Sequence, residues 1–357
     1  MKVDFTITSL RRGGGESVLV TIANNLASRG YEIKIITYSL PHEYELNPKI
    51  KIVKLHSGII KNQTLRYIHE LYKYYRIKNN RPDALISFMT QTSLSAILIA
   101  KLFRIHIIAS EHTNHARTST NKRLVNFTRK YIYRFANYVT ILTSYDLEFY
   151  KKNKSNAVIV TNPCTFKQVS DSIIQKEKII LGIGGLHKYH IKGFDNLLKL
   201  IKPVLDKHKD WKLMLVGETK ISGYDFLYQL AKDLKIENQV VFAGLRDDVQ
   251  NIMSKSEIFV LSSRNEGLPM VLIEAMFQGM ACVSYNCVSG PSDIIENNIN
   301  GILVSDQDQT EMAFQINRLV EDKQLRDKLS RSTSKIASKF DEDLVCNKWE
   351  SLIKSEL

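Results

Sequence analysis

Short apolar runs alternate with helical segments along the whole chain, and this alternation constrains the fold more than any other feature. Apolar runs with strand character are expected at 3–8, 32–38, 51–55, 84–87, 106–110, 138–142, 157–160, 178–183, 212–216, 240–243, 258–261, 281–285 and 301–304. Helical segments lie between most of them. This order predicts an α/β fold whose parallel sheets are covered by helices. Ligands of such folds bind beyond the carboxyl ends of the strands.

A proline and a polar segment divide the chain. Its 357 residues suffice for two domains of ordinary size. Pro163 follows the expected strand at 157–160, and mostly polar residues continue to Lys178. Such composition is typical of a linker. We therefore predict a first domain at 1–165, a second at 166–340 and a final helical segment at 341–357.

Charge is distributed unevenly. The chain carries +13 overall, with 25 Lys and Arg against 10 Asp and Glu in residues 1–165, and 25 against 27 in the remainder. A basic half indicates a polyanionic partner, such as nucleic acid, an anionic membrane surface or a phosphorylated lipid. A surface that is basic only for solubility would not gather the whole excess in one half.

Two basic segments of the first half carry regularly spaced aromatic residues. Among the five Lys and Arg of 121–136, apolar side chains recur at helical spacing: Leu124, Phe127, Tyr131 and Phe135. Residues 65–81 have the same character, with four tyrosines. Such helices lie on anionic membranes, but a core stripe behind a solvated charged face gives the same pattern. The charge excess favours a peripheral position on the anionic inner face of the plasma membrane.

Cysteine usage and hydropathy indicate the compartment. The four cysteines show no metal-binding or redox spacing: Cys164, Cys282, Cys287 and Cys346. Free thiols are typical of a reducing cytoplasm. No apolar run approaches the length that spans a bilayer. We expect a cytoplasmic protein.

Residues 258–276 combine a strand, a tight turn and a helix with two acids. Glu266 lies in the turn and Glu274 in the helix. Helical side chains lean toward the N-terminus, so both carboxylates reach the space above the turn. The N–H groups of Gly267 and Leu268 face the same space, where a helix N-terminus favours anions. Two carboxylates beside free N–H groups suit a nucleotide sugar. The alternative is that Glu266 and Glu274 are two unrelated acids on the protein surface.

Two loops of the first half follow strands. A glycine loop separates the first strand from the first helix: Gly13, Gly14, Gly15 and Glu16. Its glycines allow a ligand close to the backbone, although the spacing is not that of a dinucleotide-binding loop. The strand at 106–110 leads into Glu111, His112 and His115. A histidine there exchanges hydrogen bonds with a sugar hydroxyl. The alternatives are that the glycine loop is a plain turn and that the histidine loop is merely solvated.

A third loop, residues 187–195, carries several cationic side chains. His187 and Lys188 open it, and Lys192 stands beside Gly193 before the next helix. A lysine at a helix N-terminus is suited to hold a phosphate. An isolated Lys-Gly pair does not indicate a phosphate site, so this interpretation depends on the motifs around it.

These motifs resemble one enzyme family. Glu266-Gly267-Leu268-Pro269 with Glu274 is similar to the E-x7-E motif of retaining glycosyltransferases of family 4, and Lys192-Gly193-Phe194-Asp195 is similar to their K-G-F-D loop. The resemblance covers nearly the whole chain. It implies the GT-B fold: two Rossmann-like parallel-sheet domains facing across a cleft, and a C-terminal helix that crosses back to the first domain.

The resemblance also implies residue roles. Glu266 and His112 would act catalytically on the transferred sugar, with Glu111 orienting the histidine. The implied donor-binding residues are Lys192, Glu274, Gly267, Leu268, Arg264, Arg246, Leu245 and Gly185. Lys192 would hold the diphosphate, Glu274 the ribose, and Leu245 and Arg246 the base. The glycine loop would contact the donor phosphate or the acceptor.

One position departs from the family. Gly185 occupies the place of an arginine that grips the donor diphosphate. His187, Lys188 or Arg264 would then supply the second positive charge.

The implied activity is that of a hexosyltransferase. It would move a hexosyl or N-acetylhexosaminyl group, with retention, from a UDP-sugar to a lipid-diphosphate-linked glycan in bacterial surface polysaccharide biosynthesis (O-antigen or capsule). No cofactor or metal is expected, and Asp306-Gln307-Asp308 is interpreted as a helix cap. A GT-B-fold nucleotide-sugar epimerase is the alternative, and a nucleic-acid-binding protein is a weaker one because no nucleic-acid motif is present.

Overall fold

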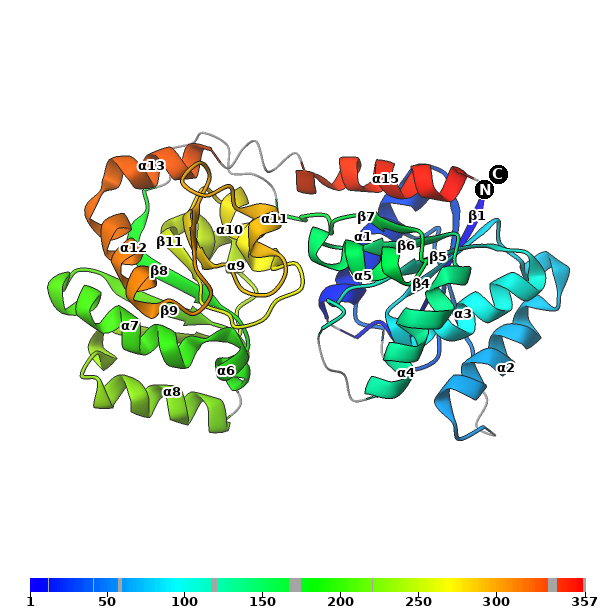
Figure 1. The fold of residues 1–357 in the computed structure, drawn as a ribbon, viewed down its shortest axis with the longest axis horizontal. Coiled ribbons are helices and arrows are strands. Elements are labelled where there is room, and N and C mark those ends of the chain that lie inside the picture. The colour runs from blue at the N-terminus through cyan, green and yellow to red at the C-terminus, as the bar shows by residue number, and fades with distance from the viewer. Residues whose placement is uncertain are drawn as a thin grey trace. The chain divides into compact units, whose positions relative to one another are not determined.

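The computed structural model describes residues 1–11, 13–40, 42–56, 60–116, 121–166, 175–219, 221–332 and 339–355. Two compact units divide the chain. The first holds 1–165 together with 341–357, and the second holds 166–340. Both are sheets covered by helices (Figure 1). The predicted polar linker falls largely on 167–174, which lie outside the described residues.

The first unit is built on a seven-stranded parallel sheet. Its strands are β1 (Lys2–Ile7), β2 (Glu32–Thr37), β3 (Lys51–Lys54), β4 (Ala84–Phe88), β5 (His106–Ser110), β6 (Tyr138–Ile141) and β7 (Ala157–Ile159). Their order is β3-β2-β1-β4-β5-β6-β7. The direction of winding reverses between β1 and β4, and parallel sheets bind ligands at such a switch point.

Helices cover both faces of this sheet. They are α1 (Gly14–Ser28), α2 (Gln63–Tyr75), η1 (Lys78–Asn80), α3 (Thr90–Phe103), α4 (Lys122–Phe127), η2 (Thr128–Ile132), η3 (Tyr133–Phe135), η4 (Ser144–Asp146), α5 (Leu147–Lys152) and α15 (Glu342–Lys354). Buried side chains of α1 and α15 share one core, and those of α2, α3, η2 and η3 share another.

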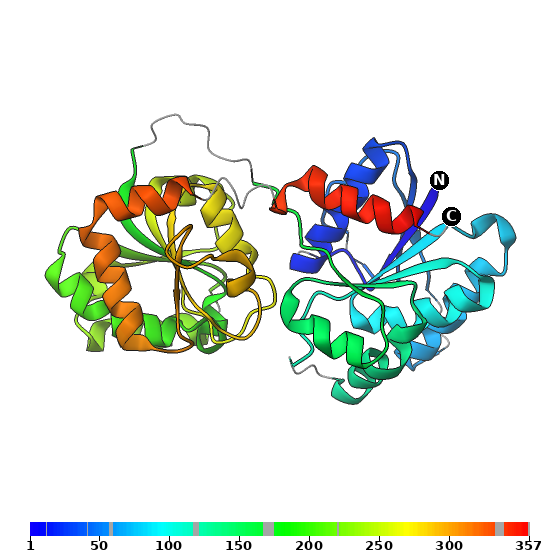
Figure 2. The same ribbon diagram turned by 45° about the horizontal axis from the view of Figure 1, so that its top comes forward.

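The C-terminal helix α15 belongs to the first unit and packs beside α1 (Figure 2). Arg29 at the end of α1 forms ion pairs with Asp343 and Glu350, both at 3.0 Å. Asp341 caps the helix by accepting from the backbone N–H of Leu344 at 3.0 Å. The last segment therefore contributes apolar and ionic contacts to the N-terminal unit.

The second unit is built on a six-stranded parallel sheet. Its strands are β8 (Glu177–Ile183), β9 (Lys212–Val216), β10 (Val240–Gly244), β11 (Ser256–Leu261), β12 (Ala281–Tyr285) and β13 (Ile302–Val304). Their order is β10-β9-β8-β11-β12-β13, with the switch point between β8 and β11. Both sheets confirm the predicted α/β class.

Helices also surround the second sheet. They are η5 (Leu186–Lys188), α6 (Tyr189–Lys192), α7 (Phe194–Lys207), α8 (Ile221–Asp233), η6 (Glu237–Gln239), α9 (Val249–Lys255), α10 (Met270–Phe277), α11 (Pro291–Ile294), α12 (Gln309–Glu321) and α13 (Lys323–Arg331). Side chains of α7, α8, α12 and α13 enter the main core with those of the strands.

Two predicted helices differ from the structure. The helix that the sequence predicts after the glycine loop begins at Gly14, so the second and third glycines of that loop form its first turn. The helix expected at 121–136 is α4 followed by a π-helical segment, η2, and a 3₁₀ turn, η3. Both differences change which side chains point into the first unit.

Candidate functional site

At the switch point of the second unit, the loop after β8 packs closely against the residues that follow β11. Gly193 has φ +70°, and a Cβ at this position would lie 1.9 Å from the carbonyl oxygen of Ser262, just after β11. The Ser262 hydroxyl donates to the carbonyl of Lys192 at 2.8 Å. The Arg264 amide donates to the carbonyl of Ile191 at 2.9 Å. Only glycine permits this approach, which fixes the loop after β8 against the end of β11.

The join brings two predicted site residues together. Lys192 Nζ lies 2.8 Å from Glu266 Oε1, and the Ser263 hydroxyl donates to the same oxygen at 2.6 Å. The two charged side chains are 21% and 12% exposed, so the pair faces the site instead of open solvent. The Lys192 chain runs over Gly184, where a Cβ would lie 3.0 Å from it. A cation and a carboxylate thus meet at the sheet edge where ligands bind.

Arg264 is engaged elsewhere. Its guanidinium donates to both carboxylate oxygens of Asp195, at 2.7 and 3.0 Å, and to the carbonyl of His190. Burial alone would raise the pKa of Asp195, but the hydrogen bonds and charge of Arg264 hold it below its usual value. Both terminal nitrogens of Arg264 are therefore engaged, and the predicted contact of Arg264 with a phosphate would require its pair with Asp195 to open.

Glu274 on α10 is a carboxylate without a partner. Within the described part of the chain, no side chain or backbone group bonds to it, and burial raises its pKa from 4.5 to about 7. A buried carboxylate usually has a partner. Hydroxyl groups of a ligand would supply the missing hydrogen bonds.

The tight turn that the sequence predicts before α10 is closely packed. Gly290, at φ +102°, packs so closely that a Cβ would lie 2.3 Å from the carbonyl oxygen of Gly267. Ser289 donates to the same carbonyl at 3.2 Å. No hydrogen bond of the described residues uses the N–H groups of Gly267 or Leu268. Two donors at the start of a helix remain available for an anion.

Gly185 stands where the resemblance implies an arginine, and a histidine ring lies against this position. A Cβ on Gly185 would lie 2.9 Å from the ring of His187. His187 Nδ1 is 3.6 Å from Glu218 Oε2, too far for a hydrogen bond, while Lys188 is exposed. Of the three predicted substitutes for the arginine, His187 lies nearest to its place.

The predicted base-site residues lie outside the nearby cavity. Leu245 is 73% exposed, and Arg246 pairs with Asp248 at 2.8 and 2.9 Å. A cavity of about 350 Å³ opens beside them at the carboxyl ends of β9 and β10. It is lined by Thr219, Ile221, Tyr224, Asp225, Phe242, Ala243 and Gly244. The aromatic rings of Tyr224 and Phe242 in this wall suit a planar base better than an exposed leucine does.

In the first unit, His112 lies beside the glycine loop. Its ring stacks on Phe88 with centroids 4.8 Å apart, and its Nε2 is 2.9 Å from the Ser110 hydroxyl. A Cβ on Gly15 would lie 3.8 Å from His112 Cγ and 2.5 Å from Met89 Cε. Burial lowers the pKa of His112 to about 4, so the ring is neutral at pH 7. Among the described residues, its Nδ1 has no hydrogen-bond partner.

The glycine loop is held by a tyrosine that the sequence did not single out. The Tyr44 hydroxyl accepts from the Gly13 amide at 2.8 Å and donates to the Gly13 carbonyl at 2.9 Å. The Glu16 side chain folds over Gly13, and Gly14 faces open space. The first turn of α1 is thus fixed in place with one glycine uncovered.

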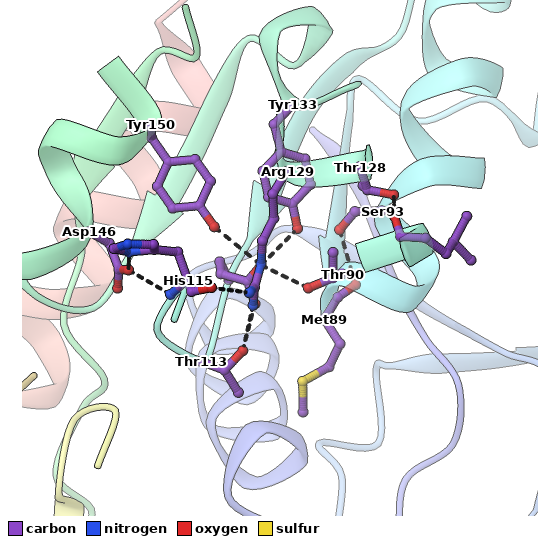
Figure 3. A network of polar contacts seen from close by, with 12 residues as sticks. Met89, Thr90, Ser93, Thr113, His115, Thr128, Arg129, Tyr133, Asp146 and Tyr150 are labelled. Atoms are coloured by element: carbon purple, nitrogen blue, oxygen red, sulfur yellow. Dashed lines mark hydrogen bonds and ion pairs between the residues drawn. The ribbon is translucent and has the colours of Figure 1, made fainter. Parts of the chain in front are cut away.

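Glu111 does not orient His112, contrary to expectation. It is 2% exposed and accepts from Arg129 Nε at 2.9 Å, from Thr90 at 2.8 Å and from Tyr133 at 3.2 Å. These three partners are labelled in Figure 3. Burial would raise the pKa of Glu111, but the charge and hydrogen bond of Arg129 hold it below its usual value.

His115 is also part of this buried network. Its backbone N–H donates to Asp146 Oδ1 at 2.8 Å, its ring Nδ1 lies 2.7 Å from the same oxygen, and its carbonyl accepts from Arg129 at 3.2 Å. The network joins the segments that follow β4, β5 and β6 and leaves His112 as the histidine beside the glycine loop.

A cavity of about 340 Å³ occupies the switch point of the first unit. It is lined by Ile7, Thr8, Ser9, Glu16, Met89, Thr90, Gln91, Glu111, Thr113, Val125 and Arg129. Its walls come from the ends of β1, β4 and β5. Each unit therefore has its own candidate site at the position that its topology dictates.

The aspartates of the Asp306-Gln307-Asp308 stretch agree with the predicted cap. Asp308 accepts from the backbone N–H of Glu311 at 3.0 Å at the start of α12. Within the described ranges, no group of three or more His, Cys, Asp or Glu is placed to hold a metal ion.

Sequence reasoning missed Ser263, Tyr44 and Arg129. Ser263 is the second residue after the strand predicted at 258–261, so its position was a usable signal. Tyr44 lies far from the glycine loop in sequence, and Arg129 was interpreted as part of a charged surface. Neither contact has a local sequence signal.

Two models of protein families match the chain. Glycosyltransferase Family 4 matches residues 12–165, and Glycosyl transferases group 1 matches residues 165–336. The two models together extend over most of the chain. The chain therefore belongs to the family 4 type of glycosyltransferases and is a transferase.

Two curated relatives extend over nearly the full length. One is the GalNAc-alpha-(1->4)-GalNAc-alpha-(1->3)-diNAcBac-PP-undecaprenol alpha-1,4-N-acetyl-D-galactosaminyltransferase of Campylobacter jejuni, 28% identical over 99% of this chain and 98% of the relative. The other is the amylovoran biosynthesis glycosyltransferase AmsD of Erwinia amylovora, 27% identical over 96% of both chains.

Solved structures share the fold. Anabaena HepE in complex with UDP matches with a TM-score of 0.82 at 19% identity, over 99% of this chain and all of that one. The lipopolysaccharide outer core galactosyltransferase WaaB matches with a TM-score of 0.76 at 20% identity, over the full length of both. The fold is GT-B, as predicted. Across the described residues, no helix combines the length and apolarity that a membrane crossing requires.

Proposed function

We propose that this glycosyltransferase moves a hexosyl or N-acetylhexosaminyl group, with retention, from a UDP-sugar to a lipid-diphosphate-linked glycan in bacterial surface polysaccharide biosynthesis. A named relative uses an undecaprenol-diphosphate-linked acceptor, another serves amylovoran biosynthesis, and a structural neighbour binds UDP. These comparisons favour a transferase over the epimerase and nucleic-acid alternatives. We place the enzyme in the cytoplasm, peripheral on the inner membrane face.

The observation that carries this proposal is the cluster at the second switch point. Lys192 and Glu266 are 74 residues apart in sequence, yet they form an ion pair at 2.8 Å. The turn and helix that follow Glu266 carry two unused backbone amides and the unpartnered carboxylate of Glu274. One cation and two N–H donors suit a diphosphate, and one open carboxylate suits a diol. A nucleoside diphosphate sugar presents both groups.

The proposed chemistry needs no nucleophilic side chain and no metal. The bond between the sugar C1 and the diphosphate oxygen breaks, and a bond from C1 to the acceptor hydroxyl oxygen forms. The hydroxyl proton passes to the leaving phosphate oxygen. Lys192 and the amides of Gly267 and Leu268 stabilise the charge that develops on the diphosphate. Glu274 holds the ribose hydroxyls.

Three further side chains act on the sugar and the phosphate. Glu266 leaves its ion pair with Lys192 when the donor enters, and its carboxylate then stabilises the positive charge that develops at C1. His112 is neutral and exchanges hydrogen bonds with a sugar hydroxyl. His187 supplies the second phosphate contact in place of the family arginine.

Release of UDP from a UDP-sugar and a lipid-linked acceptor tests the function. Lys192→Ala and Glu274→Ala should each abolish most transfer, with circular dichroism spectra unchanged. Lys188→Ala is the matched control, because this lysine is exposed in the same loop. Full activity of Lys192→Ala, or equal losses in all three variants, would refute the site.

The proposed membrane contact involves the segment 121–136 of the first unit. Phe127, Tyr131 and Phe135 follow one another at helical spacing and are 49%, 53% and 51% exposed, whereas Arg129 between them is buried. The core-stripe interpretation of this segment is therefore wrong. Exposed apolar side chains also occur on the neighbouring helix α3, at Leu98 (43%) and Leu102 (60%).

Basic residues border these apolar side chains. The exposed ones in the same segment are Lys122, Arg123, Lys130 and Arg134. Aromatic rings flanked by cations bind the interface of an anionic bilayer through apolar burial and charge attraction together. We infer that this face contacts the membrane that carries the acceptor.

Vesicle co-sedimentation tests this inference. Wild-type protein should sediment with phosphatidylglycerol vesicles and less with phosphatidylcholine vesicles, and salt should weaken the binding. Phe127→Ser with Tyr131→Ser should reduce it several-fold. Phe314→Ser is the matched control, since this phenylalanine is 59% exposed on the second unit. Unchanged binding of the double variant would refute the assignment.

A further inference from the structure

The first unit has a second cavity that the proposed chemistry does not use. Its volume is about 390 Å³, and it is lined by Asn62, Gln63, Thr64, Thr90, Gln91, Asn121, Leu124, Val125 and Thr128. Seven of these nine side chains end in an amide or a hydroxyl, and none carries a charge. The walls come from the starts of α2, α3 and α4 and from η2.

This neutral cavity adjoins the switch-point cavity. Thr90, Gln91 and Val125 line both. Thr90 and Thr128 are visible beside the buried Glu111 network in Figure 3, which also shows Arg129 turned toward that network. A ligand in the switch-point cavity therefore has a neighbouring polar space into which its next unit can extend.

Part of the polar lining is already in use. Asn62 caps α2 by accepting from the Leu65 amide at 3.1 Å, and Gln63 donates to the Tyr67 hydroxyl at 2.7 Å. Thr128 donates to the Leu124 carbonyl at 2.9 Å. These bonds hold the wall in shape.

Other lining groups have no partner. In the part of the chain that the structure describes, the side chains of Thr64, Gln91 and Asn121 make no hydrogen bond. The two amides each offer a donor and an acceptor, and the hydroxyl offers both. Such a set is complementary to a ligand that is itself neutral and rich in hydroxyl groups.

We propose that this cavity binds a neutral sugar of the acceptor glycan, one unit removed from the sugar that receives the transferred group. This inference rests on the proposed function and adds to it that the enzyme recognises at least two acceptor sugars. A diphosphate or a carboxylated sugar is disfavoured, because no lysine or arginine lines the cavity. An apolar chain would leave the side chains of Thr64, Gln91 and Asn121 without hydrogen-bond partners.

Saturation-transfer NMR with defined saccharides tests the proposal without requiring turnover. The probes are methyl glycosides of glucose, galactose, N-acetylglucosamine and N-acetylgalactosamine, and disaccharides built from the same units. Wild-type protein should bind at least one disaccharide more tightly than either of its monosaccharides. Gln91→Ala and Asn121→Ala should each reduce that preference about fivefold, as expected for loss of one hydrogen bond.

Controls separate this inference from the proposed function. Asn79→Ala is the matched variant, because this exposed asparagine lies in η1, before β4 and away from the cavity. UDP binding, followed by thermal shift, should be unchanged in all three variants. If UDP fails to bind wild-type protein, the proposed function is wrong. If UDP binds but the disaccharide preference is absent or unaffected by the two cavity variants, this inference alone is wrong. Displacement of the disaccharide by millimolar pyrophosphate, with the monosaccharide retained, would also overturn it.

Discussion

Replacing Glu274 with glutamine should stabilise the ligand-free protein in a pH-dependent manner. The side chain has no partner, and burial raises its pKa from 4.5 to about 7. Between these two values the unfolded chain releases a proton that the folded chain keeps. Stability therefore falls as pH rises through this window and stays low above it. Glutamine has nearly the same shape and does not titrate.

The size of the effect follows from the shift. A change from 4.5 to about 7, at about 1.4 kcal/mol per unit, gives an upper value of about 3 kcal/mol. Part of the side chain is accessible to water, which screens the charge, so we expect about 1 to 3 kcal/mol. For a unit of this size, that corresponds to several degrees of melting temperature.

Thermal melting of both proteins at pH 5, 6, 7 and 8 tests this reasoning. The advantage of Glu274→Gln over wild type should be small at pH 5 and should reach its full size near pH 8. A constant difference across this range would mean that the carboxylate is not buried as the structure places it. A destabilised variant at pH 8 would mean that Glu274 has a partner.

Three further substitutions test other contacts of the two units. Gly193→Ala should destabilise the second unit more than Gly244→Ala does. Both residues have positive φ, but only at Gly193 would a Cβ overlap another part of the backbone. Chemical denaturation of the two variants measures the difference in stability. Glu111→Gln should cost about 3 kcal/mol in the same assay, because it leaves Arg129 buried without its counter-charge; an unchanged midpoint would contradict the buried pair. Tyr44→Phe should raise the acceptor KM and leave UDP binding intact, since it releases the glycine loop of the first unit only; equal effects on both would contradict this.

The fold could be predicted because its signal is local. Buried parallel strands give short apolar runs, and the helices between them give their own periodicity. The start of α1 was misplaced because glycines usually end helices. Here the first turn packs against Met89 and His112 at Gly15, where a Cβ would lie 2.5 Å from the end of the Met89 side chain and would displace it. Tertiary packing outweighs the poor helix propensity of glycine at this point.

The segment 121–136 shows where periodicity fails. A regular helix would place Phe127, Tyr131 and Phe135 on one face, and that face could be either core or solvent. Arg129 is two positions from Phe127 and from Tyr131 and therefore lies on the opposite side of a helical segment; this side is buried while the aromatics are exposed. A single-sequence pattern contains no signal for which of the two sides faces the core.

The candidate site was predictable in position but not in pairing. Lys192, Glu266 and Glu274 follow or lie near strand ends, so their location follows from the topology. The contact of Lys192 with Glu266 and that of Arg264 with Asp195 join segments about 70 residues apart. Which cation meets which acid depends on the close approach at Gly193, and the sequence alone did not reveal it.

The most direct test of the account is a calorimetric titration of UDP into wild-type protein and into Lys192→Ala, with Lys188→Ala as control. The account predicts that wild type and the control bind UDP with equal affinity and that Lys192→Ala binds at least tenfold more weakly, since a charge-assisted contact to phosphate is worth more than 1.4 kcal/mol. Equal affinity in all three proteins would contradict the assignment of the second switch point as the donor site.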